Sequence, residues 1–235
     1  MIAVCILVAP ACSGSGSSGT KATSVTAPTS VPRSTDSADS TPLGGTQAND
    51  SATTIGSDVD ITTAQAQEAL AATTFADPTT IGRIELYKES PAMVDAAAAA
   101  AAELTLTGAR KWAAVYVLAN ADGHAADLAR FLTDADSTIR VMAAIGTIGQ
   151  GESLGFPVLV DALAVDQPMV AFDPPMPAWE AASIALARHT AQTLGPAFDA
   201  DPTDRHDSQQ RWNDWWTASA SGLRFDETTE LWSVA

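Results

Sequence analysis

Residues 110–118, RKWAAVYVL, recur thirty positions later as residues 140–148, RVMAAIGTI. In both copies apolar side chains lie three or four positions apart, as Trp112 and Tyr116 do, which is the spacing of one helix face. Each copy also holds a pair of alanines, and small residues let neighbouring helices approach closely. The two stretches are therefore predicted to be related helices that pack tightly against their neighbours.

A second, shorter element repeats together with these helices. Residues 128–132 precede the second helix, residues 159–163 follow thirty-one positions later, and a third alanine-rich helix is expected around residues 179–186. A helix pair that recurs roughly every 30 to 40 residues is typical of an α-solenoid, in which each pair covers the apolar face of the next. The predicted fold of residues 61–235 is all-α, a short α-solenoid preceded by a disordered tail.

Residues 128–149, LARFLTDADSTIRVMAAIGTIG, resemble a HEAT repeat. The resemblance is carried by Leu128 and Leu132 on the first helix, Asp134 in the turn, Arg140 on the second helix and the alanine pair after it. In that family the turn Asp and the helix Arg form a ladder between successive repeats. The resemblance thus implies a structural role for Asp134 and Arg140.

Further helices are expected on both sides of this repeat. Residues 62–73 and 91–104 are rich in alanine, and the second segment follows Ser90 and Pro91, a capping residue and a proline at the first helical position. Residues 81–88 have no pattern that assigns them.

The closing helix is marked by tryptophans. Trp212, Trp215, Trp216 and Ser219 share one helix face because they lie at positions i, i+3, i+4 and i+7. We interpret this face as a C-terminal cover of the solenoid; the alternative is an exposed aromatic binding surface.

The first twelve residues, MIAVCILVAPAC, form an apolar stretch too short to span a bilayer. Ala9, Pro10, Ala11 and Cys12, followed by serines and glycines, resemble the lipobox of bacterial lipoproteins, in which the Cys is lipidated. The resemblance is to bacterial lipoproteins that carry a HEAT-repeat domain. It implies a lipid anchor at Cys12 and a place on the extracytoplasmic face of the cell membrane. Ordinary signal cleavage with secretion, or an unprocessed N-terminus, are the alternatives.

Residues 13–60 differ in composition from the rest of the chain. They include 11 Ser, 9 Thr and 6 Gly, and few large aliphatic residues. Such a segment buries too little apolar surface to offset the entropy of ordering it. It is predicted to be a disordered tether between residues 1–12 and the helical domain.

The charge balance limits the partners. The chain has 12 Lys and Arg against 28 Asp and Glu, which gives a formal net charge of −16. A protein that neutralises phosphates needs a basic surface, so nucleic-acid binding is not expected. A protein partner that is basic, or whose binding depends on a cation, is favoured over an anionic one.

One motif suggests catalysis. Residues 151–155, GESLG, match the G-x-S-x-G nucleophile elbow, and an aspartate followed by His189 or His206 gives the chain order of an α/β-hydrolase. The elbow requires a strand before it, however, whereas residues 139–148 have helical periodicity. We interpret residues 149–155 as a turn between two helices, and keep a secreted serine hydrolase that uses Ser153 as the alternative function.

No cofactor or metal site is expected. The acidic residues from Asp199 to Asp207 lack the glycine and the final glutamate of a calcium loop, and they are interpreted as a connector with Asp207 or Ser208 as the cap of the last helix. The three histidines are scattered, and neither Cys5 nor Cys12 lies in the helical domain.

The most distinctive irregularity is an insertion at residues 166–177. Four prolines keep it out of a helix. It is either a strap packed over the domain or a recognition loop, since insertions in repeat proteins collect on one edge. The candidate recognition residues are its apolar side chains, Met169, Val170, Phe172 and Met176.

These features together predict a non-enzymatic module. We expect a HEAT-like domain, tethered to the membrane outside the cytoplasm, that binds a protein or serves as a scaffold. The groove of a solenoid does not itself identify the ligand.

Overall fold

The computed structural model describes residues 60–169, 175–197 and 199–235. This part of the chain is mainly helical, as the sequence predicts, and no helix in it is long and apolar enough to cross a membrane. Cys12 and the proposed tether up to residue 59 lie outside the described residues, as do Val170 and Phe172. The helices are α1 (Thr63–Ala72), α2 (Pro78–Tyr87), α3 (Pro91–Ala101), α4 (Gly108–Ala119), α5 (Ala125–Ala129), α6 (Ser137–Gly149), α7 (Gly155–Ala162), α8 (Ala178–Thr190) and α9 (Pro202–Ser219).

Several helices begin at residues that favour a helix start, and the side chain of the preceding residue caps α1, α2, α6 and α9 but not α3. Helix α1 has a capping box between Thr62 and Gln65, and α3 begins at Pro91 after Ser90. The segment around residues 81–88 that the pattern left unassigned belongs to α2, which starts with Pro78 and is capped by the side chain of Asp77. All three helix starts follow from local sequence.

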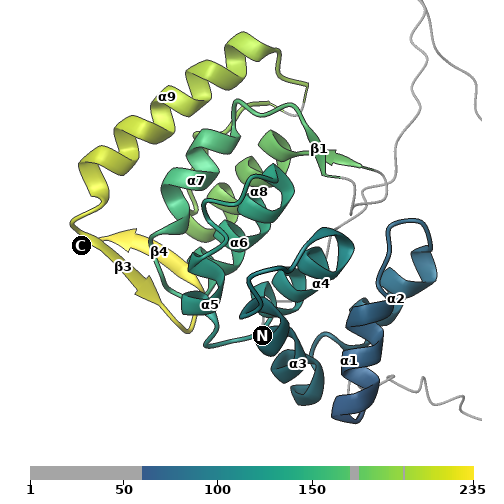
Figure 1. Cartoon of the computed structure of the whole chain (residues 1–235). Coiled ribbons are helices and arrows are strands. Elements are labelled where there is room, and N and C mark those ends of the chain that lie inside the picture. The colour runs from purple at the N-terminus through teal and green to yellow at the C-terminus, as the bar shows by residue number, and fades with distance from the viewer. Residues whose placement is uncertain (1–59, 170–174, 198) are drawn as a thin grey trace, which may run out of the picture. The chain divides into compact units, whose positions relative to one another are not determined.

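The helices follow one another from α1 and α2 at one end to α9 at the other (Figure 1). Helix α4 packs against α3 and α6, and α6 packs in turn against α7 and α8. Helix α2 joins the series through contacts with α1 and α4. Each helix therefore has its main contacts with elements near it in the sequence.

Helix α6 is the most enclosed element. It contacts α4, α5, α7, α8 and β1, and 11 of its residues are buried. A Cβ atom on Gly146 would lie 2.6 Å from the Ala119 Cα of α4 and 2.7 Å from the Leu128 Cδ1 of α5. Gly146 is thus the point at which three helices meet too closely for a side chain.

The described residues include two short antiparallel hairpins that the sequence pattern did not predict. Strand β1 (Pro168–Met169) pairs with β2 (Met176–Pro177), and β3 (Leu223–Asp226) pairs with β4 (Leu231–Val234). The first hairpin closes the base of the insertion. The second lies after α9 and contacts α8 through β4.

Helix α9 covers the C-terminal part of the domain by packing on α7. The Trp212 side chain is fully buried, and the half-buried Trp216 ring stacks on Phe156 with 5.3 Å between ring centroids. The structure therefore favours a covering role for this tryptophan face. The expected cap at Asp207 or Ser208 is wrong, because the helix begins at Pro202 and the Asp201 side chain accepts hydrogen bonds from the main-chain N–H groups of Thr203 and Asp204.

The hairpin β3–β4 is attached to the helices by polar contacts. The Trp232 indole N–H donates to the main-chain oxygen of Ile148 at 2.9 Å. The His189 Nδ1–H donates to the main-chain oxygen of Glu230 at 3.2 Å. These bonds attach the chain's last strand and turn to the C-terminal ends of α6 and α8.

Replacing Gly146 by alanine tests the close contact at α6. We expect Gly146→Ala to lower the free energy of unfolding by about 1–3 kcal/mol, because the new methyl group overlaps the Ala119 main chain. Chemical denaturation measures this change. Gly82→Ala in α2 is the matched control: no atom lies within 4 Å of its Cβ position, so this variant should gain about 0.5–1 kcal/mol from helix propensity. A neutral Gly146→Ala variant would contradict the packing described for α6.

His189 makes the stability depend on pH. Burial lowers the pKa of the His189 imidazole below its usual 6.5, against the hydrogen bond to Glu230 that raises it. As the pH falls below 6.5 the unfolded chain takes up this proton while the folded protein does not, so the free energy of unfolding should fall by at most about 1.4 kcal/mol per pH unit. Denaturation of His189→Gln between pH 7 and about pH 5 should lack this slope. The matched variant of the exposed His206, His206→Gln, should retain it.

Candidate functional site

The turn before α6, with Asp134 in it, forms a junction with helices α4 and α6. The Asp134 Oδ2 atom accepts a hydrogen bond from the Lys111 ammonium of α4 at 2.7 Å, and both side chains are mostly buried. The other carboxylate oxygen accepts from the main-chain N–H of Asp136 at 3.0 Å. Asp134 therefore connects the turn to the preceding long helix.

Arg140 contacts the same turn through its main chain. Its Nη1 donates to the main-chain oxygens of Asp134 at 2.6 Å and Ala135 at 3.0 Å. The HEAT-repeat resemblance implies a ladder of turn Asp and helix Arg. In this structure the two residues meet through a carbonyl, and the cation paired with the Asp134 carboxylate is Lys111.

The surroundings of the Asp134 carboxyl favour its ionised form. Its burial raises the pKa, but the hydrogen bonds from Lys111 and from the Asp136 main chain, together with the nearby charges of Lys111 and Arg140, outweigh this effect. The pKa of Asp134 consequently lies below its usual 3.8. The contact stabilises the fold above that usual pKa and weakens as the pH falls through the lowered value.

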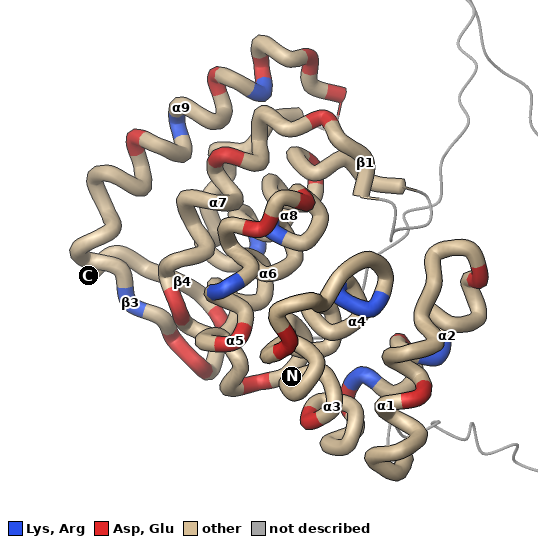
Figure 2. Tube along the Cα trace, in the orientation of Figure 1, with Lys and Arg blue, Asp and Glu red and all other residues tan. Residues whose placement is uncertain are grey.

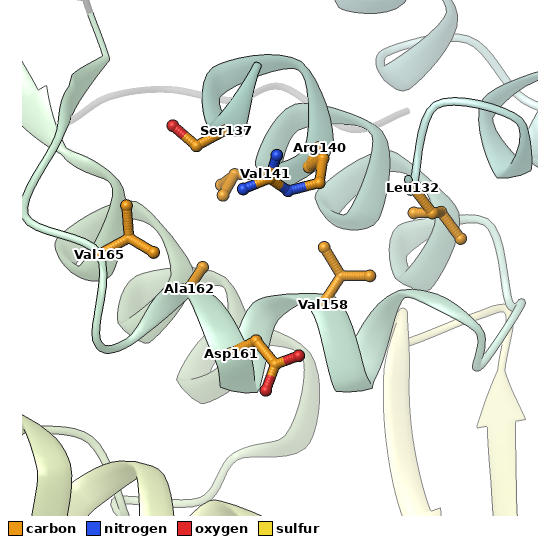
Figure 3. A pocket seen from close by; sticks show the side chains of 8 residues that line it. All are labelled: Leu132, Ser137, Arg140, Val141, Val158, Asp161, Ala162 and Val165. Carbon is orange, nitrogen blue, oxygen red and sulfur yellow. The ribbon is translucent and has the colours of Figure 1, made fainter. Parts of the chain in front are cut away.

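A cavity of about 120 Å³ opens next to this junction, between α6 and α7. Figure 3 shows the Arg140 guanidinium beside the cavity and the side chains of Val158 and Ala162 on its opposite wall. Asp161 stands at the edge, and no ion pair joins it to Arg140 within the described residues. The remaining lining side chains are Leu132, Ser137, Val141 and Val165.

The insertion begins beside this cavity and is anchored to the domain. The Ser137 hydroxyl at the cavity donates to the Gln167 side-chain oxygen at 2.8 Å. Asp166 pairs with Arg205 of α9 at 3.0 Å, and the Arg205 guanidinium lies over the Trp179 ring. The base of the insertion is therefore a packed strap.

This anchoring corrects the expectation for one candidate recognition residue. Met169 is fully buried in the core and is not available to a partner, while Met176 is half-buried against the core. An apolar residue in a turn is expected to contact a partner, but Met169 lies in strand β1, paired with Met176, and its side chain is buried. Val170 and Phe172 fall outside the described residues.

The G-x-S-x-G match lies in a turn between two helices, as the periodicity predicts. Helix α6 precedes it and α7 begins at Gly155, so the strand of a nucleophile elbow is replaced by a helix. Both glycines have packing reasons: Gly151 has φ +81° beside the Phe225 ring, and a Cβ on Gly155 would lie 2.4 Å from the Ala144 main-chain oxygen. Within the described residues, Ser153 forms no hydrogen bond with a histidine.

Acidic residues are spread over the surface. Figure 2 shows Asp and Glu at many turns and helix ends, with Lys and Arg at fewer places. Over the described ranges, no group of three or more His, Cys, Asp or Glu side chains is arranged to hold a metal ion.

Comparison with known proteins found no matching family, curated protein or solved structure.

Sequence reasoning missed several members of this site, among them Lys111 and Val158. Lys111 follows Arg110 in the repeated helix, but its contact with Asp134 crosses 23 positions and has no local signal. Val158 lies one position before the repeated segment 159–163, so its place beside the cavity depends on how α7 packs on α6.

The Lys111–Asp134 pair should stabilise the fold more than an exposed pair does. We expect a double-mutant cycle with Lys111→Met and Asp134→Asn to give a coupling of about 1–3 kcal/mol, because both groups are mostly buried. The matched cycle with Arg110→Met and Glu103→Gln concerns a pair that is 40% and 42% exposed, and should give about 0–1 kcal/mol. Chemical denaturation and circular dichroism provide the measurements. Equal couplings in the two cycles would show that Asp134 does not connect the turn to α4.

Proposed function

We propose that residues 61–235 form a short α-solenoid of HEAT-like helix pairs. The support is the order of contacts, in which α2, α4, α6 and α8 touch in series and α1 touches α3. The Lys111–Asp134 pair links one helix pair to the next. Helix α9 and the hairpin β3–β4 then cover the C-terminal end.

We further propose that this solenoid is a non-enzymatic protein-interaction or scaffold module. The observation that carries this proposal is the cavity beside Arg140, which lies next to both the turn junction and the base of the insertion. The location of Ser153 in a turn between helices also favours binding over hydrolysis. His189, one of the two histidines that the elbow reading offered, uses its Nδ1 for the main-chain oxygen of Glu230 and not for a carboxylate.

The proposed location is the outer face of the cell membrane, through a lipid on Cys12. Two acyl chains give stable anchoring, since each buried methylene contributes about 0.8 kcal/mol. The excess of acidic residues supports a lipid anchor over electrostatic attachment, because an anionic membrane surface repels an acidic domain.

Site-specific photo-crosslinking in intact cells tests the interaction proposal. We expect a crosslinker at Leu132, beside the cavity, to give a discrete product, and one at the exposed Ile184 of α8 to give none. A domain that acts only as a spacer would give no product at either position. A fluorophosphonate probe tests the alternative: labelling that disappears in Ser153→Ala would replace the binding module with a serine hydrolase.

Replacing Cys12 tests the anchor. The unmodified chain should incorporate a fatty-acid analogue and partition into the membrane fraction, and Cys12→Ser should lose both properties because no other proposed anchor is available to it. Cys5→Ser is the matched control and should behave as the unmodified chain. Membrane retention of Cys12→Ser would mean that another part of the protein, such as the tryptophan helix, binds the bilayer.

A further inference from the structure

Within the domain, only one of the three guanidinium nitrogens of Arg140, Nη1, donates hydrogen bonds that the structure describes. Its Nη1 donates to the main-chain oxygens of Asp134 and Ala135, while its Nε and Nη2 have no partner among the described residues. The two carbonyl bonds fix the orientation of the group. Nε and Nη2 together form an edge that binds a carboxylate through two parallel hydrogen bonds.

Part of the wall of the cavity next to this guanidinium is aliphatic, although Ser137 and Asp161 also line it. Val141 and Ala162 are buried in its wall, and Val158 and Val165 are half-buried (Figure 3). Its volume of about 120 Å³ is well below that of sites for whole small-molecule ligands. The space suits one small aliphatic group placed beside a carboxylate.

We propose that this cavity binds the C-terminal residue of a partner protein. The α-carboxylate would pair with Nε and Nη2 of Arg140, and a small aliphatic side chain would lie against Val158 and Val165. In a C-terminal residue the α-carboxylate and the side chain are attached to the same Cα atom. One residue can therefore contact both the guanidinium and the aliphatic wall. An Asp or Glu side chain supplies the carboxylate without the aliphatic group. The inference rests on the proposed function, because it names the chemistry of the partner at that site.

The surrounding charge adds a second requirement. Asp161 is exposed at the cavity edge, and the side chain of Asp166, at the start of the insertion, is 71% exposed. Because Asp166 is paired with Arg205, it is the Asp161 carboxylate that repels an acidic tail and attracts a basic one. The partner's last residues are therefore neutral or basic before the terminal aliphatic residue. Ala235 is held elsewhere, since its main-chain N–H donates to the Gly222 main-chain oxygen.

Binding of a labelled peptide to the full chain tests the proposal. The probe is fluorescein-labelled Gly-Lys-Gly-Lys-Val, with a free C-terminal carboxylate or as the amide, followed by fluorescence anisotropy. We expect saturable binding of the acid, and binding of the amide weaker by about tenfold or more, because the amide cannot form the charged pair. Equal binding of the two forms, or no saturable binding of the acid up to about 10 mM, overturns the proposal.

Variants separate the cavity from the fold. Val158→Phe fills the cavity without changing the Arg140 bonds and should abolish binding, whereas Val94→Phe, at a half-buried valine of α3, should bind as the unmodified chain. Arg140→Lys keeps the charge but loses the two-nitrogen edge, and should weaken binding by about tenfold. Unchanged binding by Val158→Phe, with its melting temperature also unchanged, overturns the proposal.

Two further probes identify the source of the carboxylate. An amidated peptide that ends in Glu would bind as well as the free acid if a side chain were the natural ligand, and this result overturns the C-terminal assignment. The peptide Leu-Trp-Ser-Val-Ala has the sequence of residues 231–235. If it binds more tightly than the valine peptide, and the protein sediments as a dimer, the ligand is a second copy of this chain and the assignment to a partner protein is overturned. Discrete crosslinks from Leu132 without any peptide selectivity would reject this inference and leave the proposed function standing.

Discussion

The close packing of helix α6 is the constraint on which the rest of the domain depends. Its neighbours α4, α5, α7 and α8 all contact it, and Gly146 and the alanine pair allow them to approach its main chain. An interior packed at this density does not accept an added methyl group without displacement of its surroundings. The positions of Asp134 and Arg140, at the start of this helix, follow from the same packing, because α6 carries the turn against α4.

Much of the helical structure could be predicted because its signals are local. The repeat of residues 110–118 at 140–148 identified α4 and α6, and the Ser90–Pro91 pair identified the start of α3. A polar residue followed by proline also starts α2 at Asp77 and α9 at Asp201, and there, unlike at Ser90, the side chain does cap the helix.

The two hairpins and most of the site could not be predicted, because they depend on contacts distant in sequence. Strands of two or four residues are too short to show alternation, so β3 and β4 have no clear signature. The pairing of Asp134 with Lys111 instead of Arg140 depends on how α4 lies beside the turn. The burial of Met169 has no local signal either, because an apolar residue in a proline-rich segment fits both a buried strap and an exposed loop.

The bond from Trp232 to Ile148 has a consequence for how the chain acquires its structure. It joins groups 84 positions apart and connects the final strand to the end of the central helix. Contacts of such long range form late, because the entropy of closing the intervening loop must be offset first. A chain emerging from a ribosome or a translocation pore can assemble α1 to α6 from nearby segments. It completes the C-terminal side of α6 only when the strand that holds Trp232 has been released.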